Sequence, residues 1–188
     1  MPPPRPTQLL HHFLETSVQA GETVIDATCG NGHDTLFLAR LVGSSGNVIA
    51  TDVQQQAIDS TRMRLEQELG FNNCSTHLLC HSRLREIAEP DSISAIVFNL
   101  GYLPGAAHEL TTTPEKTVKA LEAAVTLLRP GGSIGVVCYT GHPGGGDEAE
   151  VVEKFFNDLQ NHQTARYGIV GTLKPAPFLL FSTKRSKQ

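Results

Sequence analysis

The stretch that decides the fold is Val24-Ile25-Asp26-Ala27-Thr28-Cys29-Gly30-Asn31-Gly32-His33-Asp34-Thr35. An apolar run comes first, two glycines follow, and a helical pattern then begins, which predicts a strand, a tight turn and a helix. In parallel sheets, ligands bind beyond the carboxyl ends of the strands, where such turns lie. Glycines let a ligand approach the backbone, and the helix N-terminus offers unpaired N–H groups. We therefore expect a nucleotide-like ligand at this turn.

Strand and helix patterns alternate along most of the chain. Helical spacing of apolar residues covers 8–18, 34–41, 56–69, 114–128 and 147–159, and strand-like runs cover 23–27, 47–52, 75–80, 93–99, 133–139, 164–170 and 178–183. This alternation predicts an α/β fold with a mostly parallel, doubly wound sheet and helices on both faces. No helical pattern separates the last two strands, so we expect one antiparallel C-terminal strand in the sheet.

The composition is that of a small globular domain. The chain has 188 residues, of which 39% are hydrophobic and 18% charged, and its formal net charge is −4. We expect a single domain over residues 1–188, with a flexible Pro-rich start over residues 1–7. The apolar content excludes a disordered chain. The acidic total argues against broad, non-specific binding of nucleic acids, although it permits a local basic patch.

Several features predict a soluble protein of a reducing, cytoplasmic compartment. The N-terminal residues lack the apolar core of a signal peptide, and no apolar run is long enough to cross a membrane. The cysteines form no CxxC pair. The 8 histidines are scattered and no H-E-x-x-H motif occurs, so we predict no metal site.

Two ligand classes fit the glycine turn, namely a dinucleotide and S-adenosylmethionine (SAM). The dinucleotide fingerprint G-x-G-x-x-G requires a third glycine, and Thr35 occupies that position. Asp26 stands where methyltransferases place the acid that faces the SAM amino group, and Asp52, after the next strand, can accept both ribose hydroxyls. We therefore favour SAM. The alternative is a purely structural turn, in which Asp34 and Thr35 cap the helix.

Two further loops, at the same edge of the predicted sheet, carry candidate residues for chemistry. Asn99 follows the most apolar strand and can accept a hydrogen bond from an amine, while Tyr102 can pack on a flat base. Tyr139 and His142 belong to the second loop and are candidates for the substrate pocket. The acidic pair Asp147-Glu148 suits a helix N-terminus and is interpreted as capping. Simple turns would also explain both loops.

With these loops in place, the chain resembles the MnmM (YtqB-like) family, long labelled rRNA methylases, from about His11 to Lys184. The resemblance rests on residues 26–35, on Phe98-Asn-Leu-Gly-Tyr-Leu-Pro-Gly105 with Thr112, Thr113 and Pro114 after it, and on Tyr139-x-Gly-His-Pro-Gly-Gly145. It implies a class I SAM-dependent methyltransferase (Rossmann-like) fold. The implied reaction converts 5-aminomethyl-2-thiouridine to its 5-methylaminomethyl form at the wobble position, in the anticodon loop of tRNA. A homodimer in the cytoplasm, or in the plastid stroma of a plant, is also implied.

The motifs and the resemblance together give a candidate site. The residues expected to hold SAM are Asp26, Cys29, Asn31, Gly32, Asp34, Thr35, Asp52, Gln54 and His81. Of these, His81 is predicted to end the third strand, near the adenine. The residues expected to face the acceptor are Asn99, Tyr102, Tyr139 and His142. Asn99 would orient the amine, and Tyr139 or His142 would take its proton or exclude its ammonium form.

Other functions remain open from the residues alone. A methyltransferase of this kind could act on an rRNA base or a small metabolite, and a similar turn serves oxidoreductases and non-catalytic nucleotide-binding modules. The cations that could form an RNA-facing patch are Arg62, Arg64, Arg83, Arg85, Lys116, Lys119 and Arg129. Most of them are interpreted as parts of solvated helix faces. An enzyme that reads one modified base needs only a local patch, so a net charge of −4 is compatible with tRNA.

Overall fold

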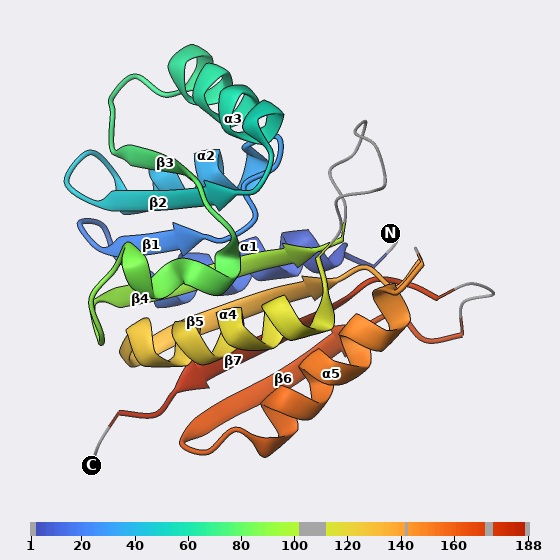
Figure 1. Cartoon of the computed structure of the whole chain (residues 1–188). Coiled ribbons are helices and arrows are strands. Elements are labelled where there is room, and N and C mark those ends of the chain that lie inside the picture. The colour runs from blue at the N-terminus through green and yellow to red at the C-terminus, as the bar shows by residue number, and fades with distance from the viewer. Residues whose placement is uncertain (1–2, 102–111, 142, 172–174, 187–188) are drawn as a thin grey trace.

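The computed structural model describes residues 3–101, 112–141, 143–171 and 175–186 (Figure 1). Within these residues, one seven-stranded sheet has the order β3-β2-β1-β4-β5-β7-β6. The strands are β1 (Thr23–Asp26), β2 (Asn47–Asp52), β3 (Cys74–Leu78), β4 (Ile93–Leu100), β5 (Leu128–Cys138), β6 (His162–Gly168) and β7 (Phe178–Lys184). Neighbouring strands pair in parallel except β7, which is antiparallel to both β5 and β6. The predicted parallel sheet with one antiparallel strand is confirmed.

Helices cover both faces of this sheet. They are α1 (Pro6–Ser17), α2 (His33–Val42), α3 (Gln55–Glu68), α4 (Pro114–Leu127), α5 (Gly145–Asp158) and the 3-10 helix η1 (His81–Glu86), and none of them has the length and apolar character of a membrane span. In Figure 1, α4 and α5 lie in front of the sheet, whereas α1 and α2 lie behind it. Each face has its own apolar core, with Phe98 and Leu121 in one and Leu10 and Val97 in the other. Because β4 contributes to both cores, its sequence is nearly all apolar.

The packing of α1 brings the N-terminal part of the chain to the carboxyl ends of β4 and β5 (Figure 1). Leu10 is completely buried, and a Cβ atom on Gly135 of β5 would overlap its Cδ1 atom. Phe13 packs on Phe181 of β7, with ring centroids 5.1 Å apart. Glycine at position 135 therefore allows α1 to lie directly on the sheet.

Several element boundaries differ from the sequence prediction. α1 begins at Pro6, two residues before the predicted helical pattern, because proline in the first turn loses no hydrogen bond. β3 ends at Leu78, and His81 begins η1 instead of ending the strand. Residues 129–132, expected as a turn between the helix at 114–128 and the strand at 133–139, are already part of β5, where the register is irregular between Ile93 and Ala95.

Candidate active site

A cavity of about 660 Å³ opens at the carboxyl ends of the strands. Several of the predicted site residues line it together, from the turns after β1, β2, β3, β4 and β5: Cys29, Asn31, Asp34, Asp52, Gln54, His81, Asn99 and Tyr139. Tyr102 and His142 lie outside the described residues. Residues far apart in the sequence thus meet at one edge of the sheet, as expected for an open α/β fold.

Asp52 forms hydrogen bonds with the turn after β1 and with the turn after β2. Its Oδ2 atom accepts a hydrogen bond from the Gly30 backbone N–H (3.0 Å), and its Oδ1 atom accepts one from the Gln54 N–H (3.0 Å). Gly30 has a positive φ of 49°, a conformation that favours glycine. Gly30 and Asp52 both line the cavity. Each carboxylate oxygen keeps acceptor capacity beyond these bonds, so Asp52 can also accept from ligand hydroxyls.

Asp26, Gly32 and Thr35 are not part of the cavity wall. Asp26 is completely buried, and its carboxylate accepts hydrogen bonds from the Thr35 hydroxyl (2.6 Å) and the Thr28 N–H (3.2 Å). The carboxylate thus lies behind the turn and supports it, and the expectation that Asp26 faces a ligand amino group stays a prediction. A Cβ atom on Gly32 would come within 2.8 Å of Thr61 Cα, so this glycine serves the close packing of α2 and α3.

The buried Asp26 predicts a pH-dependent stability. Burial raises the pKa of its carboxyl from 3.8 to about 7, and the nearby Asp34 charge adds to the shift. Between these values the folded protein keeps a proton that the unfolded chain has released, so stability falls as the pH rises. We expect wild type to lose about 1.4 kcal/mol per pH unit relative to Asp26→Asn across this window. Urea unfolding at several pH values measures this difference.

The comparison with Asp26→Asn is needed because His81 also makes the stability depend on pH. Burial lowers the pKa of its imidazole to about 4, with a further contribution from the Lys116 charge. The unfolded chain binds this proton more readily, so His81 makes stability rise with pH between about 4 and 6.5, opposite to Asp26. The contribution is the same in wild type and in Asp26→Asn, so it cancels in the difference. A difference that stayed constant with pH would contradict the protonated, buried Asp26.

Asn99 and Asp34 form the most informative contact of the cavity. The Asn99 Nδ2 atom donates to Asp34 Oδ2 at 2.5 Å, and the Asn99 N–H donates to the Thr28 hydroxyl at 2.7 Å. A carboxylate only accepts hydrogen bonds, so the amide nitrogen must face Asp34 and the amide oxygen must point the other way. That oxygen, Oδ1, is buried and has no hydrogen-bond partner among the described residues. It requires a donor, and a bound ligand can supply one.

Three further titratable residues of the cavity wall, His81, Tyr139 and Cys29, are uncharged at physiological pH. His81 is buried and uncharged, and its Nε2 atom has no partner among the described residues. Burial, with the Asp34 charge as a second cause, raises the pKa of Tyr139 above its usual value of 10.0, which keeps its hydroxyl protonated. Burial likewise raises the pKa of the Cys29 thiol. Tyr139 is thus suited to donate a hydrogen bond, while the expectation that Tyr139 or His142 takes the amine proton or excludes its ammonium form stays a prediction.

Several residues of the cavity wall were not predicted from the sequence. Arg5, Thr7 and His11 of the N-terminal segment line the cavity, as does Thr112. No local motif marks the first three, and only the docking of α1 brings them there, whereas Thr112 follows the motif at residues 98–105. Glu148 was interpreted as a helix cap, but it is buried and accepts hydrogen bonds from the hydroxyls of Thr112 (2.5 Å) and Thr117 (2.6 Å).

Glu148 therefore holds the end of the loop that follows β4. In Glu148→Gln, one of the two threonine hydroxyls loses its acceptor, because the amide nitrogen cannot accept, and the other keeps only a neutral acceptor. We expect a loss of about 2 kcal/mol in the free energy of unfolding, measured by urea denaturation. The matched control is Asp147→Asn, at an exposed neighbouring position, for which we expect almost no change. Equal effects of the two substitutions would contradict the buried bridge.

The chain is similar to proteins of known structure over nearly its whole length. The family model described as "Putative rRNA methylase" matches residues 48–182. A crystal structure from Clostridium thermocellum, named as a "putative rRNA-methylase", superposes with a TM-score of 0.93 at 34% identity and covers 98% of this chain and 100% of its own. A methyltransferase from Streptococcus mutans, solved in complex with SAH, gives a TM-score of 0.86 at 35% identity over 97% of this chain and 99% of its own.

The sheet and its cavity are those of the class I SAM-dependent methyltransferases. Among curated proteins, a chloroplastic tRNA (mnm(5)s(2)U34)-methyltransferase of Arabidopsis thaliana is 41% identical over 189 residues, which cover 95% of this chain and 69% of that protein. The chain belongs to the rRNA methylase family of the matching model. The predicted fold class and the predicted family resemblance are confirmed.

Proposed function

We propose that this chain transfers a methyl group from SAM to the amine of 5-aminomethyl-2-thiouridine, at the wobble position of the tRNA anticodon loop. The product is the 5-methylaminomethyl form. The name of the Arabidopsis relative supports this substrate, since it describes a tRNA (mnm(5)s(2)U34)-methyltransferase. The observation in this chain that carries the proposal is the unpaired, buried Oδ1 atom of Asn99 in the cavity wall.

An amine is the acceptor that fits this oxygen. A primary amine carries N–H donors, and one of them can bind Asn99 Oδ1 while the nitrogen lone pair stays free for attack. A base carbonyl or ring nitrogen acceptor would leave the oxygen unsatisfied, which costs about 1–3 kcal/mol. The protonated Tyr139 hydroxyl, on the same wall, can donate a hydrogen bond to the substrate.

The remaining walls fit SAM. Asp52 offers acceptors for ribose hydroxyls, and the neutral His81, with its unpaired Nε2 atom, offers a partner for a polar atom of the adenine. Asn31 and Gln54 line the same part of the cavity. When bound, SAM supplies a methyl group on a sulfonium, which is already electrophilic. The chain's own residues then have to orient the amine, exclude water and keep the amine neutral.

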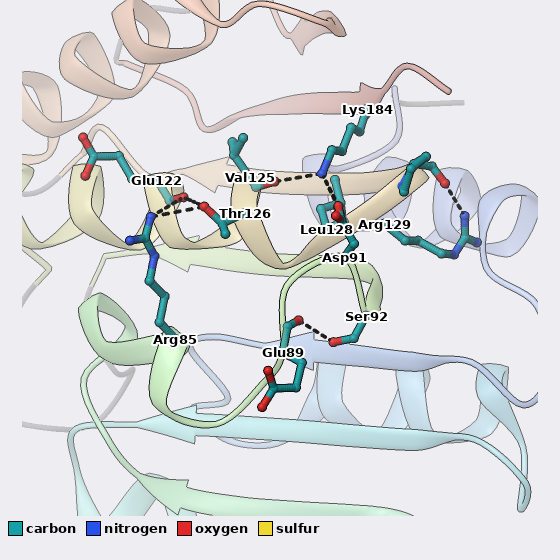
Figure 2. Close-up of polar contacts among 11 residues, drawn as sticks. Arg85, Glu89, Asp91, Ser92, Glu122, Val125, Thr126, Leu128, Arg129 and Lys184 are labelled. Atoms are coloured by element: carbon teal, nitrogen blue, oxygen red, sulfur yellow. Dashed lines mark hydrogen bonds and ion pairs between the residues drawn. The ribbon is translucent and has the colours of Figure 1, made fainter. Parts of the chain in front are cut away.

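Two cations at the cavity support an RNA substrate over a small metabolite. Most of the predicted cations bind other parts of the protein: Arg64 pairs with Glu68, Arg83 with Glu86, Lys119 with Glu115 and Arg129 with Glu22, while Arg62 donates to Thr76. Figure 2 shows Arg85 donating to the Glu122 carbonyl and the Thr126 hydroxyl of α4. Lys116 and Arg5, in contrast, are exposed, line the cavity and form no ion pair within the described residues. They are available for backbone phosphates next to the target base.

These two cations give a test of the RNA interaction. We expect the double variant Arg5→Gln and Lys116→Gln to raise the KM for tRNA and to reduce the slope of log KM against log salt by about 1–2. The control is Lys119→Gln, one turn further along α4 and paired with Glu115, which should leave the slope unchanged. An unchanged slope in the double variant would indicate that the phosphates bind elsewhere.

Mass spectrometry of tRNA nucleosides tests the proposed function directly. The purified protein is incubated with SAM and with tRNA that carries 5-aminomethyl-2-thiouridine. We expect this nucleoside to disappear and its methylaminomethyl form to accumulate. Unchanged nucleoside, together with methylation of rRNA or of a metabolite pool in a parallel reaction, would overturn the tRNA proposal in favour of that other acceptor.

We also propose a homodimer, which acts in the cytoplasm or, in a plant, in the plastid stroma. An apolar surface beside the edge strand β6 supports the dimer, because Tyr167, Ile169 and Val170 are exposed there. The chloroplastic relative supports the plastid alternative. Light scattering of the purified protein tests the oligomeric state, and a mass of one chain would contradict the dimer.

A further inference from the structure

A histidine outside the motifs contacts the centre of the cavity. His11, on α1, places its Nε2 atom 2.6 Å from Asp34 Oδ1, and its ring stacks on Phe37, with centroids 3.8 Å apart and an angle of 2° between the planes. The stacking fixes the plane of the imidazole. Because a carboxylate cannot donate, the Nε2 atom must carry the hydrogen of this bond. His11 is therefore held in one orientation as a donor to Asp34.

The contact continues to the proposed acceptor group. Asp34 receives His11 on Oδ1 and the Asn99 amide on Oδ2, so both of its oxygens are engaged and its carboxylate cannot rotate freely. The orientation of the Asn99 amide depends on this carboxylate, as argued above. The His11–Asp34–Asn99 chain thus links α1 to the buried oxygen that lacks a partner.

We propose that His11 is a positioning residue for methyl transfer, which acts through Asp34 to aim the Asn99 oxygen at the substrate amine. This inference rests on the proposed function. Without His11, the carboxylate of Asp34 could turn toward the cavity and bind the substrate as an ammonium ion. An ammonium nitrogen has no lone pair and cannot attack a methyl group. By engaging Asp34, His11 favours binding of the neutral amine through Asn99.

Two substitutions separate the hydrogen bond from the stacking. His11→Phe keeps a ring against Phe37 and removes the donor, whereas His11→Gln keeps an N–H donor and removes the ring. We expect His11→Phe to lower kcat about 10- to 100-fold, with the KM for tRNA and the Kd for SAM within about twofold of wild type. His11→Gln should recover part of the loss. The control is His12→Phe, at a more exposed position on the same helix.

A second measurement does not depend on activity. The side-chain amide protons of Asn99, observed by NMR in the protein without ligand, should be shifted by the short bond to Asp34. We expect His11→Phe to move these signals toward the values of a solvated amide, and His12→Phe to leave them in place. Unchanged Asn99 signals in His11→Phe would overturn the inference. The inference would also be overturned if both His11 variants lost kcat equally and melted at a lower temperature, because the loss would then come from reduced stability.

These outcomes separate the inference from the function on which it rests. If the wild-type protein leaves 5-aminomethyl-2-thiouridine unchanged, the proposed function fails. If wild type is active and His11→Phe is equally active, only the inference about His11 fails. A loss of SAM affinity in His11→Phe with an unchanged kcat would also overturn it, because it would place His11 in the cofactor half of the cavity.

Discussion

Asn99→Ala is expected to lower the rate of methyl transfer to tRNA by about 100-fold or more, while SAM binds as before. Removal of one oriented hydrogen-bonding group at a reaction centre typically costs this much. In this chain the Asn99 amide is held by Asp34 on one side, and its buried oxygen has no partner among the described residues. Its loss leaves the amine without an orienting contact, and single-turnover kinetics with tRNA measures the effect.

The control for this substitution is Asn72→Ala, which makes the same chemical change at an exposed position before β3. We expect its rate to match wild type. Calorimetry with SAM, performed on both variants, should give similar affinities. An Asn99→Ala protein that retained a rate near that of wild type would contradict the role of Asn99 with the acceptor, and with it the observation that carries the proposed function.

Asp52→Asn is expected to weaken the binding of SAM by about 10- to 100-fold. The carboxylate accepts the N–H groups of Gly30 and Gln54, and an amide can present an oxygen to only one of them. The other N–H then faces an NH2 group, which disturbs the turn and removes an acceptor for a ribose hydroxyl. The loss corresponds to about 1.4–2.8 kcal/mol, and calorimetry with SAM measures it.

Asp59→Asn provides the matched comparison for Asp52→Asn. Asp59 is exposed on α3, where it accepts a hydrogen bond from Gln55 (2.8 Å) and does not line the cavity. We expect SAM affinity in this variant to equal that of wild type. If Asp52→Asn bound SAM with unchanged affinity, the ribose would have to be recognised by another part of the cavity.

The sheet and half of the site follow from local sequence patterns. Apolar runs that alternate with helical spacing predict the parallel sheet, because each buried strand must be covered on both faces. Asp52 and Asn99 could be predicted as site residues because they end strands, and parallel strands deliver their last residues to the same edge. Tyr139 could be predicted for the same reason. Such residues are placed by topology alone.

Other features depend on tertiary packing and have no local signal. Asp26 ends a strand as Asp52 does, yet its side chain points behind the turn toward Thr35, which a strand pattern cannot distinguish. η1 replaced the predicted end of β3, because a short 3-10 helix has no hydrophobic period long enough to detect. The contribution of His11 depends on α1 lying against strands more than a hundred residues later in the chain, a relation that no local window contains.

The position of α1 also has a consequence for the order in which the chain folds. α1 packs on β5 and β7, so its contacts join the start of the sequence to its last strand. Contacts between such distant segments form late, because they close the longest loops. On a ribosome, β1 and β2 with their turns can assemble first, whereas α1 completes its packing only after β5 and β7 have emerged. The cofactor half of the cavity therefore forms early in synthesis, and its acceptor half is completed last.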